Sequence, residues 1–219
     1  MSSVWNWLRK SGLAAAIVVG AMALNLFCCL GESSAAVINF DDIATGTFVP
    51  NLYAGLTWDN FLCINGDIYS PPNSGYSNGV ISHSNVVLNA YGTQAGLHSD
   101  TAFSFGVGYF TAAWRNGLNL TIDAYSGGTG GILKYTVNMT LNTSAPSMLV
   151  ANLSDIDTMI FTTSGGVNAG LGDDGAQFVL DNLMINGQGG SSVPEPTSMA
   201  IFVVGALVIG YRNRRKLLK

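Results

Sequence analysis

The sequence contains little cysteine, and its three copies are poorly placed for cross-linking. Cys28 and Cys29 lie in an apolar stretch near the N-terminus, so Cys63 stands alone in the central part of the chain. A single cysteine forms no internal disulfide, which excludes a disulfide-stabilised scaffold. We expect Cys63 to be a packed thiol and the central part to be held together by a hydrophobic core.

Positive charge is equally scarce between the two ends. Residues 37–186 contain only Arg115 and Lys134 as cations, against eleven aspartates and no glutamate. Binding to nucleic acid needs a basic footprint, so this composition excludes nucleic acid as a partner. The other basic residues cluster at the two ends beside apolar stretches, which is typical of membrane insertion.

A recognisable catalytic set is also missing. His83 and His98 have no partner at the spacing of a metal site. A glycosidase needs two carboxylates that face each other, and the lack of glutamate disfavours that chemistry without excluding it. We therefore predict a non-enzymatic protein, with a secreted polysaccharide-acting hydrolase as the alternative.

The N-terminal segment, residues 1–36, has the order of a secretory signal peptide. Arg and Lys at residues 9–10 precede an uncharged apolar stretch at residues 13–30, and residues 34–36 are the small Ser-Ala-Ala. This order predicts transport by the Sec translocon and cleavage by signal peptidase. The apolar stretch is also long enough for an uncleaved anchor, but a sheet-like segment that begins at Val37 favours cleavage.

The C-terminal segment has a distinct order of its own. A Gly/Ser-rich linker occupies residues 187–192 and leads into Val193, Pro194, Glu195 and Pro196, where the prolines forbid helix. An uncharged apolar stretch follows at residues 199–211, and we predict a transmembrane helix and basic tail over residues 197–219. The stretch is short for a bilayer that needs about 20 residues, although arginine side chains can snorkel. The basic residues that would stop translocation are Arg212, Arg214, Arg215 and Lys216.

This order of linker, Val-Pro-Glu-Pro, apolar helix and basic stop resembles the PEP-CTERM sorting signal of Gram-negative bacteria. The resemblance implies that the inner membrane holds the protein transiently, until the protease-transpeptidase exosortase processes it near residues 193–196. It also implies delivery to the cell surface or the extracellular matrix, in organisms that make exopolysaccharide and form biofilms.

The middle, residues 37–186, shows short alternating segments separated by turn residues and no long helical period. Residues 132–141 alternate cleanly, and Asn116-Gly117 predicts a hairpin turn. Residues 177–186 are apolar on both faces, which is typical of a central strand. About nine such segments predict an all-β fold, a single jelly-roll-like β-sandwich flanked by the N-terminal signal helix and the C-terminal transmembrane helix.

In a jelly roll the first and last strands commonly pair. Phe-Asp-Asp at residues 40–42 and Leu-Asp-Asn-Leu at residues 180–183 resemble the framing strands of carbohydrate-binding-module-like and lectin-like jelly rolls, many of which hold a structural calcium. The resemblance implies a tentative calcium site at Asp41, Asp42, Asp181 and Asn182. Oxygen donors of this kind suit calcium, and turn capping is the alternative role.

Aromatic side chains are the candidate ligand contacts, because they can stack on the apolar faces of sugar rings. The chain offers Trp58, Tyr69, Tyr76, Tyr91, Tyr109, Trp114 and Tyr125. Tyr69 and Tyr76 flank a Ser/Pro/Asn/Gly segment, so we expect them to be exposed on a loop and to contact carbohydrate. Packing in the core is the alternative for each ring.

Overall fold

The computed structural model describes residues 36–186. The predicted signal peptide (apart from Ala36), the Val-Pro-Glu-Pro motif, the terminal helix and the basic stop lie outside these described residues. Within the described part, no helix has the length and hydropathy needed to cross a membrane.

The described residues contain ten strands, a short α-helix and one 3-10 turn. Their bounds are β1 (Ala36–Ile38), β2 (Thr47–Phe48), β3 (Thr57–Asp59), β4 (Phe61–Asn65), α2 (Gly75–Asn78), β5 (Asn85–Asn89), η1 (Ala90–Gly92), β6 (Ala95–Ala112), β7 (Arg115–Ser126), β8 (Ile132–Leu141), β9 (Ser147–Asn168) and β10 (Phe178–Asn186).

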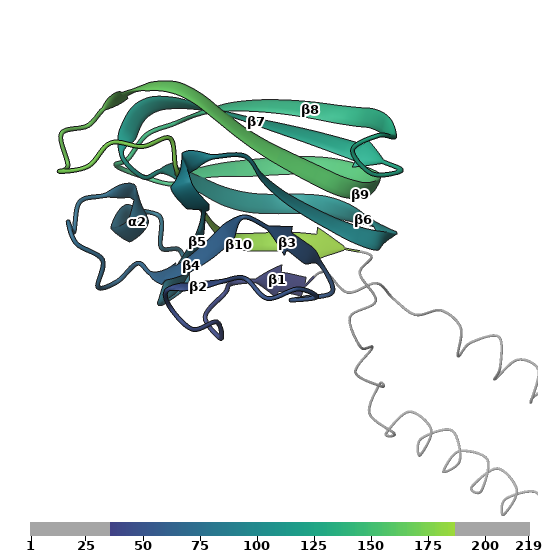
Figure 1. The fold of residues 1–219 in the computed structure, drawn as a ribbon, viewed down its shortest axis with the longest axis horizontal. Helices are drawn as coiled ribbons and strands as arrows, with labels where there is room; N and C mark the ends of the chain where they lie inside the picture. Colours follow the sequence, from purple (N-terminus) through teal and green to yellow (C-terminus); the bar gives the residue numbers. More distant parts are fainter. Residues whose placement is uncertain (1–35, 187–219) are drawn as a thin grey trace, which may run out of the picture. The chain divides into compact units, whose positions relative to one another are not determined.

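The strands form one antiparallel hydrogen-bonded sheet that folds over into two layers (Figure 1). The strand order is β2-β4-β5-β10-β6-β9-β7-β8, with β1 paired to β10 and β3 paired to β6. The first strand pairs with the last through Val37 and Met184, as predicted for a jelly roll. The prediction of an all-β, jelly-roll-like β-sandwich is thereby confirmed.

Two long strands, β6 and β9, pass from one layer into the other. Their pairing shifts register between His98 and Phe103, and Asp155 of β9 takes a left-handed backbone with φ of 56° near this bend. Beyond the bend, β9 pairs with β7 in the upper layer, whereas the second half of β6 pairs with β10 in the lower layer. Bulges of this kind bend strands, so they let one sheet supply both layers.

Apolar side chains from both layers fill the space between them. Phe61, Phe110, Phe161 and Phe178 contact one another there, with ring centroids 5.6 to 6.3 Å apart. Cys63 is also fully buried, and burial, followed by the charges of two nearby aspartates, raises the pKa of its thiol to about 11. The prediction of a packed thiol is confirmed.

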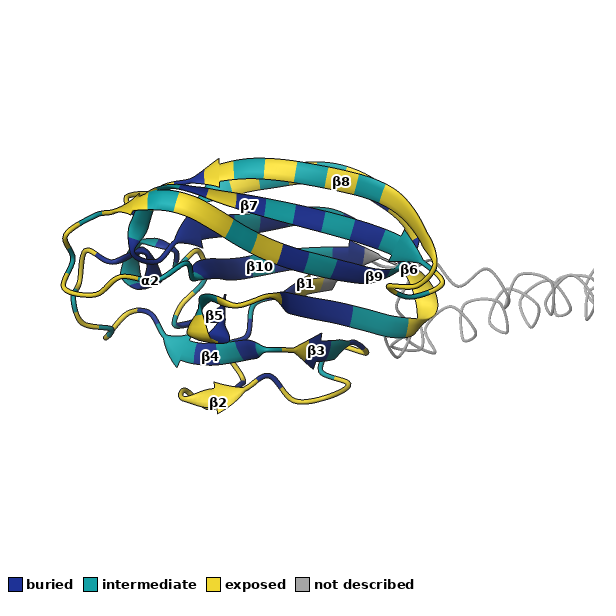
Figure 2. Ribbon diagram, turned by 45° about the horizontal axis from the view of Figure 1, so that its top comes forward, coloured by how far each residue is buried: buried dark blue, intermediate teal, exposed yellow. Residues whose placement is uncertain are grey.

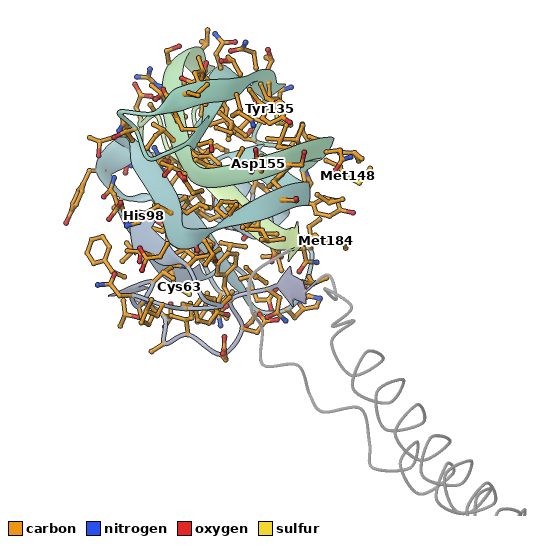
Figure 3. All side chains as sticks on the ribbon, turned by 90° about the vertical axis from the view of Figure 1, so that its right-hand side faces the viewer. Cys63, His98, Tyr135, Met148, Asp155 and Met184 are labelled. Carbon is orange, nitrogen blue, oxygen red and sulfur yellow. The ribbon has the colours of Figure 1, made fainter. Side chains whose placement is uncertain are left out.

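Strand β8 has the predicted bounds and alternation (Figure 2). Its polar side chains face solvent, while Tyr135, Val137 and Met139 pack against the core. Near the start of β8, Lys134 Nζ donates to Asp155 Oδ2 at 2.7 Å and so ties β8 to the bend in β9. Figure 3 labels Asp155 at this bend.

The predicted hairpin at Asn116-Gly117 is wrong. Strands β6 and β7 are not paired, because β9 lies between them in the sheet. Asn116 instead lies inside β7, opposite Val167 of β9, and its side-chain oxygen accepts hydrogen bonds from the backbone N–H and the hydroxyl of Thr143 at 3.0 Å. The dipeptide therefore anchors a loop between layers instead of forming a turn.

A second apolar cluster covers the outer face of the lower layer, away from the main core. It is built from Tyr76, Val86, Leu88, Ala113, Trp114 and Val179. Helix α2 and the segment that precedes it lie over this face at the left of the view in Figure 1. A sheet layer that is apolar on both faces needs such a cover, and this cover creates the site described next.

Candidate functional site

A hollow of about 450 Å³ opens on the outer face of the lower layer. Strands β2, β4 and β5 contribute Phe48, Leu62, Ile64 and Leu88 to it. The remaining lining residues come from the segments that border these strands: Gly46, Tyr69, Tyr76, Ala90, Tyr91, Trp114, Asp173 and Gln177. A mostly apolar hollow with a few polar groups is the usual form of a small-ligand site.

Three aromatic rings form one wall of the hollow. Tyr76 packs edge-on against Trp114 at 5.3 Å, and the Tyr69 ring lies 4.4 Å from the Tyr76 ring. The expectation that Tyr76 is exposed is wrong, because only 3% of the residue is accessible. The Pro/Ser/Gly-rich loop folds into α2 and carries Tyr76 inward, whereas Tyr69 is half-buried and keeps part of its ring available.

Tyr91 stands at another part of the lining and is 81% exposed. It lies in η1 with a left-handed backbone, φ of 59° and ψ of 11°. A bulky residue rarely adopts this conformation, and such residues cluster at functional sites. The side-chain amide of Asn60 holds the segment by donating to the carbonyls of Ala90 and Gln94 at 3.1 and 2.9 Å.

Asp173 and Gln177 supply the polar lining, and both come from the loop between β9 and β10. A two-pronged ion pair fixes this loop: Arg115 Nε and a terminal guanidinium nitrogen donate to Asp174 at 2.6 and 3.0 Å. Side-chain Oε1 of Gln177 is buried and accepts no hydrogen bond from the described residues. Buried acceptors without partners are uncommon, and because this oxygen is buried, a ligand reaches it only when the Gln177 side chain changes rotamer.

The four residues of the predicted calcium site have other partners. Asp181 is fully buried, and its Oδ2 accepts the backbone N–H groups of Ile81 and Ser82 at 2.7 and 2.9 Å. The hydroxyl of Ser82 donates to Oδ1 of Asn182 at 3.0 Å.

The two aspartates near the first strand are also engaged. Asp41 Oδ1 accepts the N–H of Asn85 at 3.0 Å, and Asp42 Oδ1 accepts the hydroxyl of Tyr53 at 2.6 Å. These donors fit turn and loop capping better than calcium, and across residues 36–186 no group of three or more His, Cys, Asp or Glu side chains is arranged to hold a metal. Calcium binding stays a prediction, and a melting temperature that is equal in calcium and in chelator would discard it.

His83 and His98 each face one aspartate. His83 Nδ1 lies 2.9 Å from the carboxylate of Asp67, and His98 Nδ1 lies 3.3 Å from Asp59. The hydrogen bond and then the charge of Asp67 raise the pKa of His83 above its ordinary value.

We therefore expect the Asp67→Asn variant to lower the pKa of His83, as followed by an NMR titration of the ring. Because the pKa is raised in the folded state, the ion pair contributes stability below the ordinary histidine pKa and loses it as the pH rises through the raised value. A titration midpoint that is unchanged in the variant would contradict this pairing.

The described residues form an antiparallel β-sandwich of jelly-roll type with a hollow on its outer face. The chain also carries a sorting signal, because the family model of the PEP-CTERM protein-sorting motif matches residues 192–216. The predicted resemblance is thus confirmed: the motif indicates an exported protein that is sorted through the membrane, and it implies processing by exosortase. No curated protein sequence matches the chain significantly.

Several solved structures are similar to the chain. The K1 cleaved adhesin domain of Lys-gingipain from Porphyromonas gingivalis W83 is 11% identical, with 69% of this chain and 97% of that chain covered and a TM-score of 0.43. The arabinose-bound α-L-arabinofuranosidase MgGH51 is 13% identical, with 72% and 27% covered and a TM-score of 0.40. TmCBM61, a carbohydrate-binding module in complex with β-1,4-galactotriose, is 11% identical, with 65% and 97% covered and a TM-score of 0.32. At these values the likeness concerns the fold and says nothing of this chain's ligand.

Proposed function

We propose that this protein is a non-enzymatic cell-surface or extracellular-matrix protein that binds exopolysaccharide, and that the hollow on its outer face is the sugar-binding site. The observation that carries the proposal is Tyr91, an exposed aromatic ring on a left-handed backbone, beside an aromatic wall that includes Tyr69. A flat ring held in place, with polar groups nearby, is the arrangement that a sugar needs.

The chemistry of sugars matches this lining. The C–H faces of a pyranose ring are apolar and stack on aromatic rings, while its hydroxyls need hydrogen-bond partners at the edge. Tyr69 and Tyr91 offer ring surface, and Asp173 and Gln177 offer oxygen acceptors. Burying apolar surface contributes about 25 cal/mol per Å², so partial burial of a few sugar rings gives weak binding at one site. A polymer ligand strengthens this binding because it offers repeated contacts.

Binding is favoured over hydrolysis because Asp173 is the one carboxylate that lines the hollow among the described residues. A glycosidase places two carboxyl groups about 5 to 9.5 Å apart across the scissile bond. The alternative of a secreted polysaccharide-acting hydrolase would need a second carboxylate that enters the hollow. Release of reducing ends from a bound polymer would show that the protein is a hydrolase.

The proposed route places this site outside the cell. The signal peptide directs the chain to the Sec translocon, and signal peptidase then removes the signal peptide. The sorting motif at residues 192–216 then holds the protein transiently in the inner membrane of a Gram-negative bacterium before exosortase acts. The domain would meet the exopolysaccharide only after this step.

Replacing Tyr91 by Ala tests the proposal. The ring is 81% exposed, so its loss should leave the melting temperature unchanged within about 1 °C, since surface substitutions usually stay within ±0.5 kcal/mol. We expect affinity for the bound polysaccharide to fall about tenfold, equivalent to about 1.4 kcal/mol. Affinity electrophoresis of the full-length protein against a panel of exopolysaccharides measures this.

The control is Tyr125→Ala, which removes a half-buried tyrosine ring of β7 that does not line the hollow. The mobility of the Tyr125→Ala variant in the polysaccharide gel should match that of the wild-type protein. If the wild-type protein is retarded by no polysaccharide, or if both variants are retarded equally, the hollow is not the sugar-binding site.

A further inference from the structure

The hollow carries a negative charge that no cation of residues 36–186 balances. Asp173 lines it, and within the described residues its carboxylate accepts the backbone N–H of Asp174 at Oδ1, at 2.8 Å. Arg115, one of the two cations of the described residues, donates to both carboxylate oxygens of Asp174.

The other cation of the described residues is also engaged elsewhere. Lys134 donates to Asp155 at 2.7 Å, at the bend of β9. Residues 36–186 therefore place no unpaired lysine or arginine at the hollow. A site of this kind cannot neutralise a uronate, sulfate or phosphate group, and a buried anion without a partner is costly.

Asp173 lies within electrostatic reach of the aromatic wall. Burial is the main cause of the raised pKa values of Tyr69 and Tyr76, and the Asp173 charge raises both further. Aromatic faces carry partial negative charge and attract cations within about 6 Å of the ring centre. Rings and carboxylate together thus form a surface suited to an ammonium group.

Gln177 adds an acceptor to the same lining. Its Oε1 is buried and has no hydrogen-bond donor within the described residues. An N–H or O–H group of a ligand would satisfy this oxygen, whereas a ligand acceptor would not. The polar groups of the hollow are therefore hydrogen-bond acceptors that need donors from a ligand, and an ammonium group has three N–H donors.

We propose that the hollow selects sugars that carry a protonated amine, that is, a polymer of hexosamine with free amino groups. This inference rests on the proposed sugar-binding function and names the class of its ligand. The amine pairs with Asp173 against the half-buried ring of Tyr69, while Tyr76 supports that ring from within the wall, and the rest of the sugar covers the apolar lining. Acidic polysaccharides are excluded by the same charge.

The test compares three β-1,4-linked hexamers: glucosamine, N-acetylglucosamine and glucose. Binding to the full-length protein in an uncharged detergent is measured by isothermal titration calorimetry at about pH 5.5, below the ordinary range of amine pKa values. We expect the glucosamine hexamer to bind about tenfold more tightly than the other two, and this preference to shrink with added salt because screening weakens charge pairs.

Asp173→Asn should remove the preference while keeping the residual affinity for the neutral hexamers. Asp100→Asn is the charge-matched control, because Asp100 is exposed on β6 and does not line the hollow. Equal binding of the three hexamers, or a preference that survives in Asp173→Asn, overturns the inference and leaves sugar binding intact. Failure of all three hexamers to bind also overturns the inference, whereas the proposed function is decided separately by the panel of exopolysaccharides.

Discussion

Replacing Phe178 by Ala should destabilise the domain by about 3 to 5 kcal/mol, the usual cost of removing a buried phenylalanine ring. The ring is fully buried at the centre of the core. It contacts Phe61, Phe110 and Phe161, with centroids 6.0, 6.0 and 5.7 Å away. These rings come from β4, β6 and β9, so the cavity left behind would face both layers and could not close by movement of one strand.

The measurement is the melting temperature of the full-length protein, followed by intrinsic fluorescence. For a domain of this size 1 kcal/mol corresponds to about 2 to 4 °C, so we expect a decrease on the order of 10 °C. Phe48→Ala is the matched control, since the same ring is removed from a residue that is 49% exposed. Equal decreases for the two variants would show that the interior between the layers does not carry the stability.

Several elements were predictable because their sequence pattern is local. In β8 one face is exposed, so polar and apolar residues alternate and the bounds 132–141 follow directly. Strand β10 is apolar on both faces, and it lies centrally, with β6 on one side and β5 and β1 on the other. In both cases the residues of the strand itself indicate which of its faces are buried.

Elements that depend on distant partners were not predictable. Polar residues around Asp155 interrupt the apolar pattern of β9, yet the structure continues the strand through a left-handed bend there. Asn116-Gly117 has the composition of a hairpin turn, and only the insertion of β9 between β6 and β7 shows that it is not one. Sequence order gives no direct sign of that insertion.

The candidate site was predictable in kind but not in its residues. Tyr69 lines the hollow, and Tyr76 does so as part of a buried wall against Trp114, a contact between residues far apart in sequence. Tyr91 was one of seven available aromatics, and its position between Asn89-Ala90 and Gly92 is the signal that it sits on a turn. Asp173 and Gln177 line the hollow only because their loop folds back, and the ion pair between Arg115 and Asp174 fixes the position of this loop.

The buried carboxylate of Asp181 should have the second large effect on stability. It accepts the backbone N–H groups of Ile81, Ser82 and Asn182 at 2.7 to 2.9 Å. Asp181→Ala would leave all three N–H donors without their acceptor, and we expect a loss of about 3 kcal/mol because unsatisfied buried donors each cost about 1 to 3 kcal/mol.

The matched control for this substitution is Asp157→Ala. Asp157 also accepts two backbone N–H groups, from Gly127 and Gly128 at 2.6 and 2.9 Å, but it does so at a partly exposed turn where water can replace it. We expect a loss of about 1 kcal/mol there. Similar losses for the two alanine variants would mean that burial of Asp181 adds nothing.

Asp181→Asn separates the charge of the carboxylate from its shape. Burial raises the pKa of Asp181, and the hydrogen bonds from Ser82, Ile81 and Asn182 offset this only in part. The folded state therefore holds the proton more tightly than the unfolded chain. The stability that this group contributes to the fold is lost as the pH rises from the ordinary aspartate pKa through the raised pKa.

Asparagine does not titrate. The stability of the wild-type protein relative to Asp181→Asn should thus improve as the pH falls through that window, in unfolding measured from neutral to acidic pH. A difference that moves the opposite way would mean that the hydrogen bonds from Ser82, Ile81 and Asn182 outweigh burial and that the anion is the form the fold prefers.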